Sequence, residues 1–380
     1  MPHPTRLLSA LTLGLVSAAV TAPALADGAF LNLFSHGAEP VEVGPVPEGI
    51  PSGRGGVDTE TCAGCHVEIA AEWRDSFHRQ AWTDPMFQAA FAQEPLESCQ
   101  NCHAPRRAPG QAPSGLAAQD GVDCATCHVR EGRVLAVGDG RGAPHAVEQV
   151  PFLSTSAYCA GCHQFDFPAE RGAARGHPPT QEPMQDTYEE WALSDAAAAG
   201  TECQDCHMPE ENGHRSHRFL GSHDTDFMVR AVRVEADVTR DGDEQVVSIR
   251  IAPAAIGHAF PTGDLFRRAE LQVQVEGQDP EVVAFVRDFH DVPERMPSGE
   301  VAFVRRERAD SRIPPPGFGA PRAHVFRFPA DRGPVRWSLA HLLMPSPLAA
   351  SQGFADARVR RVLHRGTLTL EPERCDASSP

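Results

Sequence analysis

The sequence contains no lysine, so each of its 34 Lys and Arg residues is an arginine. Positive charge is scarce overall, since 51 acidic residues leave a formal net charge of −17. An acidic balance of this size argues against nucleic acid and anionic membrane surfaces as partners, and it mildly favours basic partners. A well-solvated surface is the simpler interpretation of the same charge.

The sequence also lacks an apolar run of the roughly 20 residues that cross a bilayer as a helix. Residues 7–20 are apolar, follow Arg6 and precede small residues at Ala24 and Ala26, as in a secretory signal peptide. No cysteine follows this run, which disfavours a lipid anchor. We therefore expect an exported protein without a membrane span, periplasmic or extracellular. Cleavage after Ala26 would remove one positive charge and change the net charge from −17 to −18.

Cysteine is plentiful, and exported proteins usually place it in disulfides. Here the spacing differs, because ten of the 11 cysteines form five copies of Cys-x-x-Cys-His. The copies are Cys62-Cys65-His66, Cys99-Cys102-His103, Cys124-Cys127-His128, Cys159-Cys162-His163 and Cys203-Cys206-His207. With 11 cysteines and 18 histidines in 380 residues, chance gives roughly 0.015 such matches.

This motif predicts covalent attachment of haem c, with the two thiols bonded to the haem and the histidine as proximal iron ligand. Zinc sites and redox dithiols also use Cys-x-x-Cys, but neither requires histidine as the next residue. We therefore expect five haem c groups. Cys375 is left over in the acidic tail, residues 373–380, and has no spare partner in the chain.

An internal repeat relates the two Cys-Ala-Gly-Cys-His motifs, at Cys62 and Cys159. Each is followed by Trp-x-x-Ser and then by a Cys-Gln-x-Cys-His-x-Pro stretch, which begins at Cys99 or Cys203. The pattern indicates a duplicated two-haem unit with the Cys124 haem between the copies. The copies differ two residues after the serine, at His78 and Ala196, so His78 is better explained as a ligand than as a packing residue.

Histidines outside the motifs are the candidates for the distal side of each iron, and spacing alone does not pair them with haems. The candidates are His78, His145, His177, His214, His217, His223 and His258. A surface or capping role remains the alternative for each of them. For His290, His324, His341 and His364, which lie in a strand-like region, we expect that ordinary role.

The sequence resembles the multihaem cytochromes c of the cytochrome c-554 and hydroxylamine-oxidoreductase-like group. The resemblance rests on "CAGCH" with "EWRDSFH", on "YEEWALS" with "CQDCHMP", on "HRFLGSHD", and on "GHAFPTGDLFRR" from Gly257. It covers residues 58–268. It implies that His78, His217, His223 and His258 cap irons, with His145 as the fifth distal ligand and His177 as its rival.

We expect an α+β protein, in which a mainly helical and irregular multihaem cytochrome domain precedes an antiparallel β-sandwich domain. The helical pattern of Glu68–Trp82 and the short β-type runs after Phe227 support this order. The expected divisions are a signal peptide at 1–26, a flexible leader at 27–57, a pentahaem cytochrome c domain at 58–225, a β-sandwich-like domain at 226–372 and a tail at 373–380.

The first functional hypothesis is an exported electron carrier with mostly bis-histidine haems, hence of low potential, rather than an enzyme. The alternative is a multihaem oxidoreductase that acts on a small nitrogen or sulfur compound at one five-coordinate haem. The missing lysines exclude a Cys-x-x-Cys-Lys catalytic haem, and the only tyrosines are Tyr158 and Tyr188. A third hypothesis makes the β-domain a docking module for redox partner proteins.

Overall fold

The computed structural model describes residues 41, 44–50, 57–167, 182–295, 299 and 301–371, all of which belong to one compact unit. The expected signal peptide, most of the leader, His177 and Cys375 lie outside these ranges. Within them, no helix has the length and apolar character that a membrane crossing requires.

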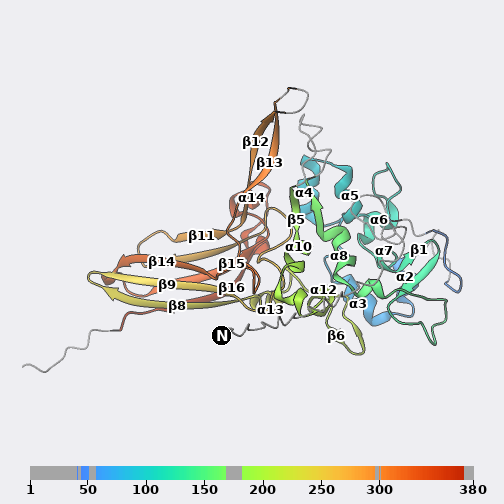
Figure 1. Cartoon of the computed structure of the whole chain (residues 1–380), viewed down its shortest axis with the longest axis horizontal. Helices are drawn as coiled ribbons and strands as arrows, with labels where there is room; N and C mark the ends of the chain where they lie inside the picture. The colour runs from blue at the N-terminus through green and yellow to red at the C-terminus, as the bar shows by residue number, and fades with distance from the viewer. Residues whose placement is uncertain are drawn as a thin grey trace, which may run out of the picture. The chain divides into compact units, whose positions relative to one another are not determined.

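Short helices and very short strands make up the part of the chain that carries the five motifs (Figure 1). The helices are α2 (Thr59–Ala63), α3 (Val67–Arg74), α4 (Pro85–Gln93), α5 (Glu97–His103), α6 (Gly115–Asp120), α7 (Cys124–His128), α8 (Ser156–His163), α10 (Thr187–Ala192), α11 (Asp195–Ala198) and α12 (Cys203–His207). The strands are β1 (Val129–Arg130), β2 (Arg133–Ala136), β3 (Glu148–Gln149), β4 (Gln164–Asp166), β5 (Pro183–Asp186), β6 (Glu210–Glu211) and β7 (His214–Arg215).

Four motifs lie at the ends of helices, since α5, α7, α8 and α12 each end on the motif histidine. A helical turn places residues three apart on one face, which brings the two cysteines of a motif to the same side. Acidic residues cap the start of three of the short motif helices, α2, α7 and α12, the last through a capping box of Glu202 with Asp205. Asp58 accepts the Thr61 N–H at 2.7 Å, and Asp123 accepts the Thr126 N–H at 2.9 Å.

The helix expected over Glu68–Trp82 is shorter than its pattern indicates, because α3 ends at Arg74. The buried Ser76 hydroxyl donates to the Trp73 carbonyl at 2.7 Å and accepts the Arg79 N–H at 3.2 Å. Such side-chain bonds compete with helical backbone bonds and favour a turn. His78 therefore lies in a turn rather than on a helix.

Antiparallel strands dominate the chain from residue 232 onward. They are β8 (Val232–Asp241), β9 (Glu244–Pro253), β10 (Arg268–Gln274), β11 (Glu281–Phe285), β12 (Arg287–Arg295), β13 (Val301–Asp310), β14 (Arg322–Pro329), β15 (Val335–Leu342) and β16 (Arg360–Leu368). One sheet has the order β11-β10-β15-β16 and another the order β14-β9-β8, while β12 and β13 form a two-stranded sheet. The α+β class is therefore confirmed. Three helices, α13 (Thr225–Val229), α14 (Ser346–Ser351) and α15 (Asp356–Val359), complete this part.

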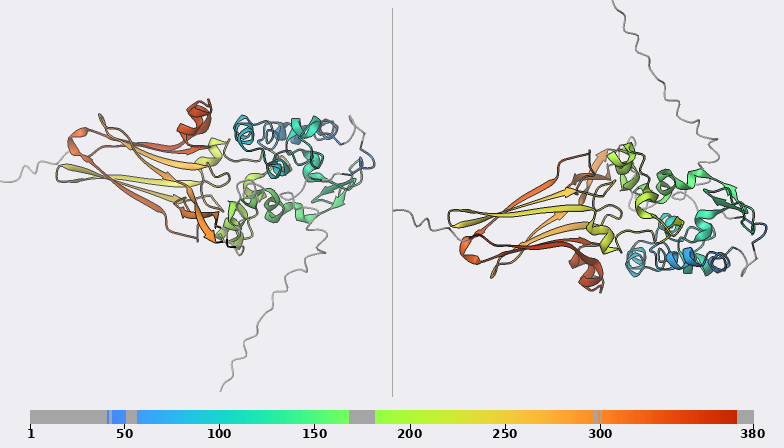
Figure 2. Two further views of the ribbon diagram at one scale, coloured as in Figure 1. Left: turned by 90° about the horizontal axis from the view of Figure 1, so that it is seen from above. Right: turned by 90° about the horizontal axis from the view of Figure 1, so that it is seen from below.

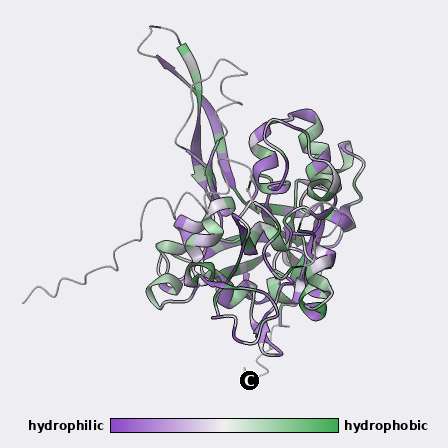
Figure 3. Ribbon diagram, turned by 90° about the vertical axis from the view of Figure 1, so that its right-hand side faces the viewer, coloured by the Kyte–Doolittle hydropathy of each residue, from purple (hydrophilic) through white to green (hydrophobic). Residues whose placement is uncertain are grey.

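The main hydrophobic core lies between these two sheets (Figure 2). Alternate residues of β9 and β10 are fully buried, among them Ile251, Leu271 and Val273. The alternation follows from the period of two in a strand, which sends every second side chain to one face. The β12–β13 hairpin extends away from the two sheets (Figure 3). Val301 and Phe303, on β13, are exposed.

Candidate haem-binding site

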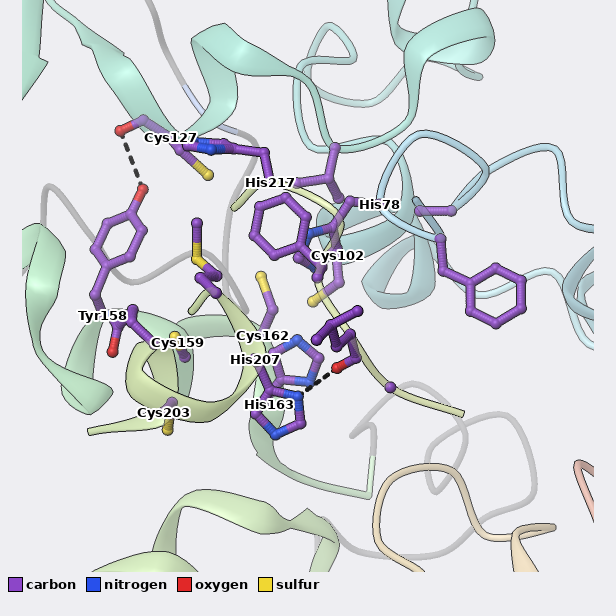
Figure 4. Close-up of a pocket in the computed structure, with 18 of the residues that line it drawn as sticks. His78, Cys102, Cys127, Tyr158, Cys159, Cys162, His163, Cys203, His207 and His217 are labelled. Atoms are coloured by element: carbon purple, nitrogen blue, oxygen red, sulfur yellow. Dashed lines mark hydrogen bonds between the residues drawn. The ribbon is translucent and has the colours of Figure 1, made fainter. Parts of the chain in front are cut away.

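A single cavity of about 2920 Å³ runs through the motif-bearing part of the chain, and all fifteen cysteines and histidines of the five motifs line it. Close-packed interiors leave few voids larger than a water molecule, so a cavity of this size requires large occupants. Sulfur atoms of different motifs and the rings of His78, His163, His207 and His217 lie close together in it (Figure 4). The ten motif cysteines are free thiols. These residues fit the haem c groups that the motifs predict.

Four of the motif histidines face a second imidazole. The pairs are His66 with His145 at 6.5 Å between ring centroids, His78 with His163 at 6.3 Å, His128 with His217 at 6.2 Å and His207 with His258 at 6.0 Å. Two imidazoles that bind one metal from opposite sides, each through a bond of about 2 Å, have centroids about 6 Å apart. Each pair therefore has the separation that bis-histidine ligation of one iron requires.

Four of the paired imidazoles are held in the form that ligates a metal. Burial lowers the pKa of His78 to about 3 and the pKa of His163, His207 and His217 to about 4, so these rings are neutral at pH 7.

Ring nitrogens of several of these histidines are bonded to backbone carbonyls. The Nδ1 atoms of His128, His217 and His258 lie 2.9, 2.8 and 2.9 Å from the carbonyls of Leu135, Arg215 and Ala259. An Nδ1–H bond of this kind leaves Nε2 for the metal.

The fifth motif histidine, His103, is different. Within the described ranges no imidazole faces it at a similar distance, and its ring stacks instead on Phe87, with centroids 3.7 Å apart and planes 7° apart. His223, which the resemblance implied as a ligand, packs edge-on against Phe77 at 4.6 Å and faces none of the motif histidines. Its ligation stays a prediction, and so does that of His177, which lies outside the described residues.

Contacts between thiols show which motifs are neighbours. Cys62 lies within hydrogen-bonding reach of Cys124, and Cys159 within reach of Cys203. Cys162 contacts Cys102 in the same way. The motifs at Cys62 and Cys124 are thus adjacent in space although the Cys99 motif separates them in sequence.

These contacts correct the expected repeat. The tryptophan of each Trp-x-x-Ser stretch donates its Nε1–H to a carbonyl two residues before a motif: Trp73 to Val122 at 2.8 Å, and Trp191 to Thr201 at 2.9 Å. The equivalent motif pairs are therefore Cys62 with Cys124 and Cys159 with Cys203. The Cys99 motif is therefore the one outside the two repeated pairs, although its sequence is the more similar to that of the Cys203 motif.

Two residues to which the sequence analysis gave no ligand-binding role, Arg267 and His341, lie in the cavity wall. Burial lowers the pKa of Arg267 and outweighs the opposite effect of Asp264 and Asp84. The same two carboxylates also oppose the lowering of the pKa of His103 by burial, so Arg267 and His103 lie near each other along the cavity. Buried His341, for which an ordinary role was expected, lines the same cavity, and Arg267 lies near enough to lower its pKa. The alternating pattern of a strand gave no signal that would distinguish His341 from a core residue.

The other strand histidines lie as expected. His290 is exposed, His324 packs against Phe285, and His364 bonds the Val229 carbonyl at 3.1 Å.

Comparison with known proteins agrees with this description. Residues 61–129 match the model of the family described as "Cytochrome c554 and c-prime". A penta-haem cytochrome c552 from Thermochromatium tepidum has a similar fold, with a TM-score of 0.63 and 21% identity over 82% of this chain and 98% of its own. Among curated proteins, none matches significantly.

The fold and the motifs define a cytochrome with several covalently bound haem c groups. The resemblance to multihaem cytochromes c of the c554 group is confirmed, by the family match over residues 61–129 and by the fold.

Proposed function

We propose that the protein is an exported pentahaem cytochrome c that carries electrons between redox partner proteins. The observation that carries this proposal is the set of four imidazole pairs, 6.0 to 6.5 Å apart, around one cavity lined by all five motifs. Haem c, when bound, accepts and releases single electrons at a potential that its ligands and surroundings set. Paired histidines block access of other ligands and, without methionine, favour low potentials.

The residues of the chain support transfer between haems. The thiol contacts bring the Cys62 and Cys124 motifs together, the Cys159 and Cys203 motifs together, and Cys102 to Cys162. Close spacing of redox centres within one protein is what electron hopping requires. The acidic surface favours basic partner proteins, with the strands from residue 226 onward as a candidate docking part.

Low-temperature electron paramagnetic resonance (EPR) of the oxidised protein, with haem counted by pyridine haemochrome, tests this function. We expect five haems per chain, at least four of them low-spin, and a redox titration at low potential. Fewer than four low-spin irons would refute the bis-histidine assignment, and potentials all well above zero would refute the low-potential carrier. A mature N-terminus at Asp27 would support export.

A second candidate function is supported by the surroundings of His103. We propose that the Cys99 haem is the one five-coordinate haem, at which a small nitrogen or sulfur compound could react. Half-buried Arg267 and buried His341 line the same cavity, and their buried Nη1 and Nδ1 atoms have no hydrogen-bond partner. A guanidinium nitrogen that is buried without a hydrogen-bond partner, as Nη1 of Arg267 is, is suited to a small anion.

Carbon monoxide (CO) binding distinguishes the two functions. If the protein is an oxidoreductase, the reduced wild type should bind CO rapidly at about one iron in five. The double variant Cys99→Ser with Cys102→Ser should lack this rapid CO binding. No rapid phase in the wild type would exclude the open haem and leave the electron carrier.

A further inference from the structure

The two Glu-Trp dipeptides of the repeat, Glu72-Trp73 and Glu190-Trp191, occupy equivalent places beside two different haem motifs. Trp73 holds the backbone before the Cys124 motif, and Trp191 holds the backbone before the Cys203 motif, each through its indole N–H. The tryptophans therefore act on the proximal side, two residues ahead of the first cysteine of each motif.

The glutamates bond the segments that carry the histidines facing these two motifs. Glu72 accepts the backbone N–H of His217 at 2.8 Å, and His217 faces His128 of the Cys124 motif. Glu190 accepts the backbone N–H of Ala259 at 3.2 Å, and the preceding residue, His258, faces His207 of the Cys203 motif. In both copies, therefore, the glutamate and the tryptophan that follows it bond the two segments that carry one pair of facing histidines.

Further bonds fix each carboxylate in place, although the partners differ between the copies. The His214 ring donates to Glu72 at 3.2 Å. Glu190 accepts from the Thr262 hydroxyl at 3.0 Å and pairs with Arg312 at 2.6 Å. Both glutamate side chains are only 9% exposed, so water competes little for these bonds.

We propose that each Glu-Trp dipeptide is a clamp that sets the separation between the distal and proximal histidines of one haem. Glu72-Trp73 clamps His217 and His128, and Glu190-Trp191 clamps His258 and His207. Glu72 and Glu190 are positioning residues, because they hold the segment that carries the distal histidine. The second clamp also joins the two parts of the chain, since His258 follows β9 and Glu190 lies on α10. The proposal rests on the proposed bis-histidine ligation.

Aspartate variants test the clamp in the full-length protein with its haems. Glu72→Asp and Glu190→Asp keep the negative charge but withdraw the carboxylate by one carbon–carbon bond, about 1.5 Å, beyond reach of the distal segment. We expect each variant to bind CO at one further iron per chain, at a rate about tenfold or more above that of this haem in the wild type. Low-spin EPR signal from one iron should weaken in parallel.

Two sets of variants serve as controls. Glu68→Asp and Glu189→Asp shorten exposed carboxylates on the same two helices and should behave as wild type. Glu72→Gln and Glu190→Gln keep the reach and remove the charge. If the glutamine variants open a haem and the aspartate variants do not, charge rather than position is responsible and the clamp is overturned.

Ligand variants separate a failure of the clamp from a failure of the proposed function. His217→Ala and His258→Ala should each open one haem. If they do so while the aspartate variants bind CO as the wild type does, the ligation stands and the clamp is wrong. If the ligand variants open no haem, both the ligation and the clamp are wrong. Haem counts of five per chain show that the compared variants have folded.

Discussion

Removal of His78 is the sharpest test of the ligand pairs, because this residue should act on a haem bound far along the chain. Its ring faces His163 at a centroid separation of 6.3 Å, although the nearest motif in sequence is that of Cys62. Because His78 is the one imidazole facing His163 within the described residues, His78→Ala should convert one iron in five, about 20% of the haem, to high-spin. EPR and the amplitude of CO binding measure this increment over the wild type.

Two further measurements decide whether the increment reflects a lost ligand. The variant leaves a space of the size of an imidazole, so added imidazole should restore the low-spin signal. His290→Ala, on an exposed strand position, should change neither signal. In a background without the Cys159 haem (Cys159→Ala with Cys162→Ala), His78→Ala should add no high-spin iron. An unchanged spectrum in His78→Ala, or an increment that persists in that background, would refute the pairing of His78 with His163.

Three other predictions concern stability. Leu271→Ala, in the core between the two sheets, should lower the free energy of unfolding by about 2–5 kcal/mol in urea denaturation, while the EPR spectrum stays that of the wild type. Tyr158→Phe should cost about 1 kcal/mol in the same assay, because the buried hydroxyl donates to the Cys127 carbonyl at 3.1 Å; no loss would show that this bond is unimportant. Burial raises the pKa of Asp310, but Arg312 outweighs it and holds the pKa below its usual value. The ion pair therefore stabilises the fold above the unfolded-state pKa of Asp310, and this stabilisation is lost as the pH falls through the folded-state pKa. In Asp310→Asn, the free energy of unfolding should fall less steeply over this acidic pH range.

The haem motifs and most strands were predictable because both follow from local spacing. The Cys-x-x-Cys-His sequence needs only one helical turn, and alternation along β9 and β10 directly shows which face is buried. The end of α3 at Arg74 was missed, because it depends on a side-chain bond from Ser76 that competes with the helical pattern.

The motif pairs could not be predicted from the sequence, because similarity between two motif sequences does not show whether the motifs lie close together in space. The Cys99 and Cys203 motifs share more residues, yet the thiol contacts and the tryptophan bonds make the Cys124 motif the equivalent of Cys203. The role of Glu72 and Glu190 was hidden in the same way, because each bonds a segment that lies far from it in the sequence.

The sequence by itself determined the chemistry of attachment: five local motifs predict haem c, and the absence of lysine excludes a lysine-ligated haem. Only the tertiary structure decided which histidine faces which motif, which motif histidine has no facing imidazole among the described residues, and which motifs are neighbours. The physical reason is that covalent attachment needs residues within one helical turn, whereas a histidine that faces a motif, such as His258, is brought there by long-range packing.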